Sequence, residues 1–430
     1  MDRNTVILGA GVTGLTVARH LGSACALFEK EERPGGLCKS DSLSGFTFDR
    51  AGHVLHLPGG SPHRWATAMP DLDLVQHRRR AWVRSSGCYT EYPFQVHTYG
   101  LPEDVVQECV SGMEEAGTGH GESSANFHDW ILSTFGKGFA KHFFVPYNEK
   151  FWACPLAELG TDWAQRFIPV PSLEEVARGS VGKSTTGFGY NTEFYYPRNG
   201  GIGAVADALH AEAPIVQLGC EAVEILLKAR RVKFSSGTSA DYEHLVSTLP
   251  LPALVSLLDD APLGIRDAAT ALKHVSLYSL NFGISRPNVS DMHWVYFPEK
   301  DTIFHRAVFP GNFSPSVAPP DHSTVSVEIS YAPDNPLSLD AARDSALRDL
   351  VRNGVMAPGD EPVVEHHFNI ATAYCVPHRD RNANVARITD FLTGHDISSI
   401  GRFGSWQHMS IHDCIMQAES LAHSLAGAGQ

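Results

Sequence analysis

Residues 5–36 decide the fold and read TVILGAGVTGLTVARHLGSACALFEKEERPGG. A short apolar run comes first, then Gly9, Gly11 and Gly14, and then a helix-like run over residues 15–21. In such a strand–turn–helix unit the first glycine permits the tight turn, and the second lets a pyrophosphate approach the backbone. The third lets the helix pack closely on the strand, and the helix N-terminus presents unpaired N–H groups to phosphate. The stretch therefore predicts a dinucleotide-binding unit.

The second strand of this unit, residues 24–28, ends at an acidic residue, Glu29. A carboxylate here accepts hydrogen bonds from an adenosine ribose and would repel a ribose 2′-phosphate. A glycine-rich turn without a ligand is the alternative, and the complete strand–turn–helix context disfavours it. Gly35 and Gly36 follow, and a glycine pair at this place resembles the FAD fingerprint of the family that contains amine oxidases, phytoene desaturases and UDP-galactopyranose mutases. We therefore expect FAD rather than NAD.

The composition restricts the class of protein. The chain has 430 residues, which exceeds what one core usually holds and predicts two or three domains. Lys and Arg number 34 against 48 Asp and Glu, and this net charge of −14 argues against nucleic acid or an anionic membrane as the main partner. The eight cysteines contain no C-x-x-C pair, no leader precedes Thr5, and the apolar run 249–258 is too short to span a bilayer. We expect a soluble, cytoplasmic protein.

The rest of the chain predicts an α/β fold with a Rossmann-like FAD-binding domain, an inserted α-helical domain and an antiparallel β-sheet substrate domain. The expected boundaries are 1–77, 198–273 and 376–430 for the FAD-binding domain, 101–180 for the helical domain, and 78–100, 181–197 and 274–375 for the substrate domain. Alternating apolar residues predict the strands of the antiparallel sheet at 275–284, 293–297, 302–309, 324–331 and 363–372.

Shorter signals complete this picture. Residues 221–227 and 244–248 are interpreted as returning strands of the cofactor domain, and residues 181–190 as a loop. Ser172 and Glu175 have the spacing of a capping box at the start of a helix. The turn at residues 85–87 predicts a hairpin.

Five longer segments carry a specific resemblance. They are YPFQ at 92–95, PYNEKFWACP at 146–155, YPRNGGIG at 196–203, HWVYFPEKDTIFHRAVFPGNFSP at 293–315 and GRFGSW at 401–406. Along nearly its whole length the chain resembles the UDP-galactopyranose mutases, with the eukaryotic type most similar. The resemblance implies conversion of UDP-galactopyranose, or a related UDP-sugar, to the furanose form without net oxidation. Reduced FAD then acts as a nucleophile on the anomeric carbon, and NADPH is a possible external reductant.

The resemblance also implies roles for individual residues. Catalytic roles are implied for Arg306, Arg166, His53 and His408, with both arginines at the leaving diphosphate. The implied cofactor contacts are Gly9, Gly11, Thr13, Gly14, Glu29, Lys30, Gly35, Gly36, Leu37, Gly52, His53, Val223, Arg402, Ser410 and Ile411. The implied substrate contacts are Tyr92, Phe94, Gln95, Asn148, Trp152, Arg166, Asn191, Trp294, Tyr296, Arg306, Tyr374 and His408. Core packing is the alternative for each aromatic residue alone. His53 with His56 lacks the further ligands that a metal site needs, so no metal is expected.

The chain departs from the family at two places. His408 stands where the family carries a diphosphate-binding tyrosine, and the insert of the fungal enzymes after NFSP is missing. We hypothesise that His408 titrates near neutrality and makes UDP affinity depend on pH. A flavin oxidase or desaturase of the same fold is the rival interpretation. A binding module without flavin, like the Rab GDP-dissociation inhibitors, is the third. The identity of the sugar and the oligomeric state stay open.

Overall fold

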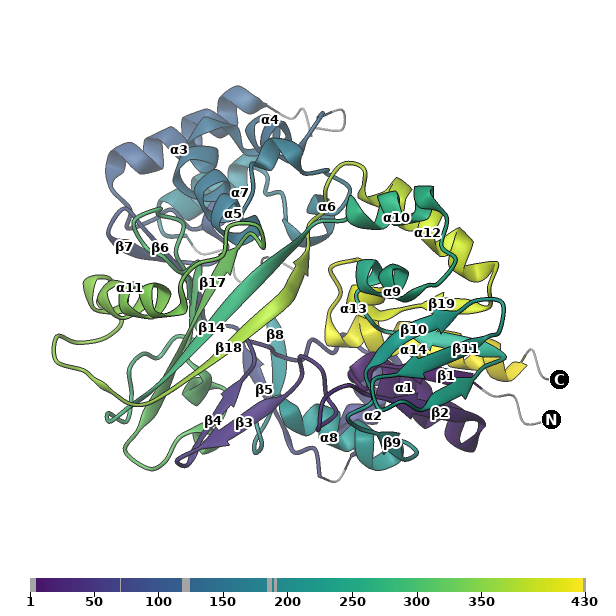
Figure 1. The fold of residues 1–430 in the computed structure, drawn as a ribbon. Helices are drawn as coiled ribbons and strands as arrows, with labels where there is room; N and C mark the ends of the chain where they lie inside the picture. The colour runs from purple at the N-terminus through teal and green to yellow at the C-terminus, as the bar shows by residue number, and fades with distance from the viewer. Residues whose placement is uncertain (1–4, 70, 118–123, 184–187, 189–191, 428–430) are drawn as a thin grey trace.

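Two large sheets of different kinds frame the molecule. The computed structural model describes residues 5–69, 71–117, 124–183, 188 and 192–427. Figure 1 shows the parallel sheet with its helices on one side, and the long antiparallel strands with a group of helices above them on the other. The predicted α/β class is confirmed. The predicted loop at residues 181–190 lies largely outside the described residues, which include only Val181–Lys183 and Phe188 of it.

The parallel sheet has the strand order β19-β13-β1-β2-β9, and each neighbouring pair within it runs parallel. Its strands are β1 Thr5–Leu8, β2 Cys25–Phe28, β9 Val216–Gln217, β13 His244–Ser247 and β19 Ile397–Ser399. All four residues of β1 are buried, as expected for a parallel strand covered on both faces. The predicted strands at the start of the chain and at 244–248 are therefore confirmed.

A separate small sheet contains the strand predicted at residues 221–227. β10, Ala222–Leu226, pairs antiparallel with β11, Arg231–Phe234, which in turn pairs with β12, Ser239–Asp241. The predicted strand at 221–227 is therefore confirmed, and it lies in this small antiparallel sheet and not in the parallel sheet.

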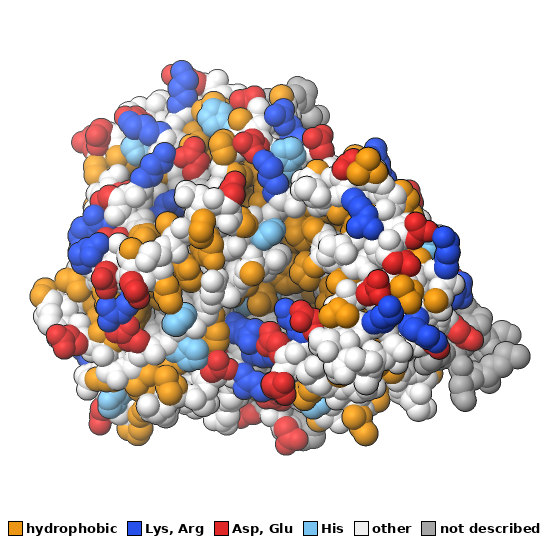
Figure 2. All heavy atoms as spheres, viewed as in Figure 1, with side chains coloured by type: hydrophobic (Ala, Val, Ile, Leu, Met, Phe, Trp, Pro, Cys, Tyr) orange, Lys and Arg blue, Asp and Glu red, His pale blue; other side chains and the backbone are white. Residues whose placement is uncertain are grey.

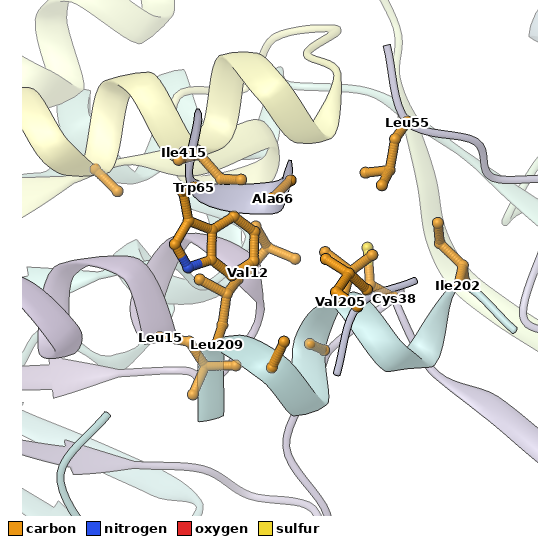
Figure 3. Close-up of a cluster of buried hydrophobic side chains, with 14 of the residues drawn as sticks. Val12, Leu15, Cys38, Leu55, Trp65, Ala66, Ile202, Val205, Leu209 and Ile415 are labelled. Atoms are coloured by element: carbon orange, nitrogen blue, oxygen red, sulfur yellow. The ribbon is translucent and has the colours of Figure 1, made fainter. Parts of the chain in front are cut away.

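Helices cover the parallel sheet and bury a common core against it. α1 Val12–Leu21, α2 Gly60–Ala68, α8 Gly203–Glu212 and α14 Ile411–Gly427 meet around Trp65. Figure 3 shows Val12 and Leu15 from α1, Leu209 from α8 and Ile415 from α14 directed into this cluster. The opposite side of the sheet is covered by α9 Leu251–Leu257, α10 Leu263–Thr270, α12 Arg381–Thr393 and the short α13 Gly401–Gly404. We identified no sequence signal for the first three of these helices.

The second large sheet has the order β18-β14-β17-β16-β15-β6-β7. Its strands are β6 Ala81–Ser85, β7 Cys88–Glu91, β14 His274–Ile284, β15 Trp294–Tyr296, β16 Arg306–Val308, β17 Ser323–Tyr331 and β18 Pro362–Cys375. All five predicted strand segments are confirmed, although β16 is shorter than the alternation indicated. The hairpin is also confirmed, since Ser85 pairs with Cys88 across Ser86 and Gly87. One junction, β15 with β6, is parallel.

The remaining elements complete the frame. α11 Leu339–Arg352 lies within the expected sheet segment and was not predicted. Two small sheets pair β3 Ser40–Leu43 with β4 Phe46–Asp49, and β5 Leu74–Arg78 with β8 Glu193–Pro197. The helices of the predicted helical stretch are α3 Glu103–Ala116, α4 Phe127–Phe139, α5 Val145–Trp152, α6 Ala164–Phe167 and α7 Leu173–Ser180. The capping box at the start of α7 is confirmed.

Two structural features are absent from the described residues. Within them, no helix has both the length and the apolar content that crossing a membrane requires. The same residues contain no group of three or more His, Cys, Asp or Glu side chains arranged to hold a metal ion.

The close packing of α1 on β1 generates the first prediction. A Cβ atom added to Gly14 would lie 1.9 Å from the carbonyl oxygen of Gly9. Because that atom belongs to the backbone, Gly14→Ala should lower the free energy of unfolding by roughly 1–3 kcal/mol. Urea unfolding of the variant and of the wild type would measure this effect.

The control is Gly264→Ala, at an exposed position inside α10 with no neighbouring atom within 4 Å. There alanine should raise the free energy of unfolding by about 0.4–1 kcal/mol, since it restricts only the unfolded chain. Equal effects of the two substitutions would contradict the packing argument.

Candidate active site

A single large cavity lies between the two sheets. Its volume is about 1600 Å³, and residues from both sheets and from the helical stretch line it. Figure 2 shows a hollow in the middle of this face, with hydrophobic walls and with basic and acidic side chains at its lower rim. Ligand pockets usually enclose roughly 300–1,000 Å³. The cavity therefore has room for a dinucleotide and a second ligand together.

Two glycine turns form one end of the cavity. Gly11 precedes α1 and provides no side-chain cap for the helix N-terminus. The Gly35 N–H donates to the Ala10 carbonyl over 2.8 Å, which brings the second turn against the first. A Cβ on Gly36 would lie 3.2 Å from the Cα of Gly11. Bare backbone on two sides and an uncapped helix N-terminus together make a cradle for phosphate.

The acidic end of β2 lies beside this cradle. Glu29 is only 8% exposed, and its carboxylate accepts the Ala10 N–H over 2.7 Å and the Glu31 N–H over 3.0 Å. These bonds fix the carboxylate at the cavity wall, where Lys30 also lies. Gly14 does not line the cavity, and its role is the close packing of α1 on β1.

Most other residues predicted to contact the cofactor also line the cavity. They are Thr13, Leu37, Gly52, His53, Arg402, Ser410 and Ile411. Ser410 caps the last helix, since its hydroxyl accepts the Asp413 N–H over 3.1 Å. Val223 is the exception. Its side chain is 48% exposed and only its neighbours Glu221 and Ala222 line the cavity, because the register shifts between residues 222 and 224 and turns Val223 outward.

These observations fit FAD. The phosphate cradle, the fixed carboxylate at the end of β2 and the second glycine turn are the features that the pyrophosphate and ribose of a dinucleotide need. In addition, His53 lines the cavity, and its buried Nδ1 atom has no hydrogen-bond partner among the described residues. Such an orphaned buried atom indicates a polar ligand.

Aromatic side chains surround the other end of the cavity. Tyr92 and Tyr296 lie with their ring centroids 4.9 Å apart. The indole nitrogens of Trp152 and Trp294 are buried and have no partner within the described parts of the chain. Predicted substrate residues that line this end are Tyr92, Gln95, Asn148, Trp152, Trp294, Tyr296 and Tyr374. Rings with unpaired donors suit a nucleobase and a sugar.

Two predicted substrate residues require separate treatment. Phe94 is fully buried, and its ring stacks on Phe143 at 5.1 Å between centroids. It does not line the cavity, so the expectation that it contacts uridine is wrong. It begins a short 3-10 turn, Phe94–Val96, which sends its side chain into the helical core. Asn191 lies outside the described residues.

Arg306, expected at the leaving diphosphate, lines the cavity but already has an anionic partner. Its Nε donates to Glu328 Oε2 over 2.9 Å, and its Nη2 donates to Oε1 over 2.5 Å. Glu328 itself is 0% exposed and does not line the cavity. Burial opposes its ionisation, but the charge of Arg306 and its hydrogen bond hold the pKa of Glu328 below its ordinary value. The interaction is therefore a buried ion pair and differs from the weak pairs that exposed charges form at a surface.

Arg166, the second predicted diphosphate residue, is also paired. Its Nη2 donates to both carboxylate oxygens of Asp413 over 2.9 Å. The side chain is 57% exposed, so this pair contributes little to stability. One of these two oxygens, Oδ2, also accepts the Ser410 N–H over 2.8 Å. The pair therefore ties α6 to the first turn of α14 at the cavity wall.

His408 lies on the cavity wall between two cations. Arg402 Nη2 donates to its Nδ1 over 3.3 Å, since a guanidinium has no acceptor. Burial, Arg402 and Arg166 hold the pKa of His408 well below 6.5. The hypothesis that His408 titrates near neutrality is therefore corrected. The histidine is neutral, with Nδ1 as the acceptor and Nε2–H as its remaining donor.

Sequence reasoning missed two carboxylates of this site. Glu328 is the single charged residue in the strand STVSVEISY, where apolar residues alternate with Ser and Thr, and a buried charge in such a strand calls for a partner. Asp413 stands three residues after Ser410, which is the spacing of a helix cap. Both signals are visible in the sequence, but neither identifies which arginine is paired.

Comparison with known proteins agrees with this site. The family model "Flavin containing amine oxidoreductase" matches residues 12–369. A crystal structure of reduced UDP-galactopyranose mutase is 27% identical, with a TM-score of 0.94, and the match covers 99% of this chain and 96% of that one.

More distant structures share the fold alone. A redesigned putrescine oxidase is 15% identical with a TM-score of 0.70, and 99% of each chain is covered. A fatty acid isomerase from P. acnes that produces CLA is 13% identical with a TM-score of 0.65, and 98% of each chain is covered. Oxidation and isomerisation therefore both occur among structures of this fold.

The surroundings of His408 generate a prediction about pH. Because the imidazole is neutral, His408→Gln, which keeps a neutral N–H donor, should leave the pH dependence of UDP affinity unchanged between about pH 6 and pH 8. His408→Phe removes the donor and should weaken UDP roughly tenfold or more at each pH, since a hydrogen bond to a charged group contributes about 1.5–3 kcal/mol. Calorimetric titration of each variant with UDP would measure this. A wild type that gains more affinity on acidification than His408→Gln would show that the histidine does titrate.

Proposed function

The chain belongs to the flavin containing amine oxidoreductase family, and from that premise we propose that it is a flavin-dependent UDP-sugar mutase. The proposed reaction interconverts the pyranose and furanose forms of UDP-galactose or a related UDP-sugar. One observation carries the proposal: a single cavity joins a dinucleotide cradle to a second region with unpaired indole donors and two arginines. The similarity to reduced UDP-galactopyranose mutase supports it.

FAD is the cofactor that the family and the glycine cradle support. The chemistry that reduced FAD supplies when bound is a nucleophilic nitrogen for the anomeric carbon, so that the sugar can change ring size without net oxidation. The residues that would hold it are those at the two glycine turns, Glu29, and the Gly52–His53 segment. NADPH as the external reductant is part of this proposal.

The protein must bind the leaving diphosphate and orient the sugar. Arg306 and Arg166 are the cations proposed for this task, since guanidinium groups bind phosphate in two-point fashion. Each must share its donors with its carboxylate partner, and Arg166 is the more exposed and freer to turn toward a ligand. His408 adds a neutral N–H donor. The buried tryptophans and the half-buried tyrosines would exclude water and position the uridine and sugar.

We also propose that separate parts of the chain bind the cofactor and the substrate. Residues 1–77, 198–273 and 376–430 would bind FAD, and residues 78–100, 181–197 and 274–375 would form the substrate region. The helical stretch 101–180 would close the uridine end, where Asn148 and Trp152 lie. Under this proposal the flavin and the sugar would meet in the cavity between the parallel and the antiparallel sheet.

An FAD-dependent oxidase or desaturase of the same fold is the second candidate. The family and the putrescine oxidase structure favour it at the level of fold. That interpretation accounts for the cradle but not for the arginines and unpaired indole donors at the far end. A binding module without flavin accounts for neither the glycine turns nor the orphaned His53 Nδ1.

The proposal predicts activity only after reduction. Purified protein should be yellow, and after dithionite or NADPH treatment it should convert at least one member of a panel of UDP-hexopyranoses and UDP-pentopyranoses to the furanose. Chromatography with mass detection should find product of unchanged mass. The air-oxidised enzyme is the control and should turn over at least tenfold more slowly.

Three outcomes would contradict the proposal in different ways. Oxidised product with oxygen consumption would indicate the oxidase. A colourless protein that binds no FAD would indicate the binding module. Equal turnover by oxidised and reduced enzyme would exclude the flavin as nucleophile.

A further inference from the structure

The buried carboxylate of Glu328 accepts hydrogen bonds from two different parts of the site. Glu328 lies on β17 directly opposite Arg306 on β16, so both side chains project from the same face of the sheet. Both of its oxygens accept from the guanidinium, and Oε1 also accepts the Gly52 N–H over 2.9 Å. A buried carboxylate is tolerated only when it is paired and hydrogen-bonded in this way.

Gly52 completes the arrangement from the cofactor side. A Cβ atom on Gly52 would lie 2.9 Å from Val308 Cγ2, 3.2 Å from Arg306 Nη2 and 3.3 Å from Glu328 Oε1. The backbone of this segment thus rests directly on the ion pair, and only glycine fits. The next residue, His53, lines the cavity at the end proposed for the cofactor.

The geometry also determines which part of Arg306 remains for a ligand. Glu328 occupies Nε and one position of Nη2, and no described residue accepts a hydrogen bond from Nη1. A guanidinium held on one edge by two bonds cannot rotate, so its remaining edge keeps one direction. Arg306 lines the cavity, and that edge is the part available to an anion.

We propose that Glu328 is a positioning residue that holds Arg306 and the Gly52–His53 segment as one unit. It fixes the direction of the guanidinium toward the diphosphate, and it fixes the distance between that anion site and the cofactor wall. This inference rests on the proposed function for the identity of the anion. The inference that one carboxylate joins two walls of the cavity does not depend on the proposed function.

Glu328→Gln is the decisive variant. The amide keeps the size of the side chain, but its NH₂ group faces the N–H donors of Arg306, so the two-point pair cannot form. The positive charge of Arg306 is then uncompensated. UDP should therefore bind within threefold of wild type or more tightly, while turnover of the UDP-sugar falls at least tenfold because the anion and the cofactor wall are no longer aligned.

A second measurement does not depend on turnover. The reduced flavin carries more negative charge than the oxidised one. Loss of a buried negative charge beside the cavity should therefore shift the midpoint potential of the bound flavin to more positive values. Spectroelectrochemical titration of the purified FAD-loaded proteins would measure it.

Glu365→Gln is the matched control. Glu365 lies on β18 in the same sheet and pairs with Arg343, but its side chain is 34% exposed and it does not line the cavity. The same change of carboxylate to amide there should leave UDP affinity, turnover and midpoint potential at wild-type values.

The outcomes separate positioning from general support of the fold. An unchanged turnover and midpoint potential in Glu328→Gln, or a parallel fall of UDP affinity, turnover, FAD content and melting temperature, would overturn the proposal. If Glu328→Gln does not retain FAD, Glu328→Asp takes its place. It keeps the charge but shortens the reach, and it should show the same loss of turnover with retained UDP affinity. If wild type itself neither binds UDP nor turns over, the proposed function fails, and the midpoint comparison alone decides the role of Glu328.

Discussion

The rest of the structure depends on one constraint. At the glycine turn between β1 and α1, backbone segments lie against one another with no side chain between them. Gly14 brings α1 so close to β1 that no side chain fits between the helix and the Gly9 carbonyl. The backbones of Gly11 and Gly36 also approach each other closely, where the second glycine turn lies against the first. Because these contacts leave the start of α1 uncapped and free of side chains, they place a phosphate site at the edge of the parallel sheet. The large cavity begins at this point.

From that edge the cavity extends to the antiparallel sheet. Three of the arginines that line it form ion pairs with carboxylates. Arg50 pairs with Glu31 near the cradle, Arg306 with Glu328 in the sheet, and Arg166 with Asp413 at the start of α14. In a chain with a net charge of −14, this arrangement keeps the cations ordered before any anionic ligand arrives. Arg402 differs, since its partners among the described residues are carbonyls, the imidazole of His408 and the faces of aromatic rings.

Much of the fold could be read from local patterns. The strand–glycine–helix unit, the long alternating strands of the second sheet, the hairpin at Ser86–Gly87 and the capping box at Ser172 each depend on interactions within a few residues. Such interactions appear in the sequence as spacing. The helices α9, α10 and α12 were missed because none of them has a side-chain cap at its start, and all three are stabilised by burial against the parallel sheet. α11 does begin at a capping residue, Ser338, whose hydroxyl accepts the Ala341 N–H, and we did not recognise that signal in the sequence.

The sequence by itself determined the cofactor cradle, because glycine spacing and the acid at the end of β2 act through the local backbone. It also indicated most residues of the second region, through their occurrence together in longer motifs. Only the tertiary structure decided that Phe94 packs into the helical core while its neighbours Tyr92 and Gln95 reach the cavity, and that Val223 faces outward. Only the antiparallel register of β16 and β17 placed Glu328 on Arg306, and only the burial of His408 beside Arg402 and Arg166 lowered the pKa of that histidine. Charges and hydrogen bonds between residues far apart in the chain depend on which strands pair and in what register, and no local spacing encodes that.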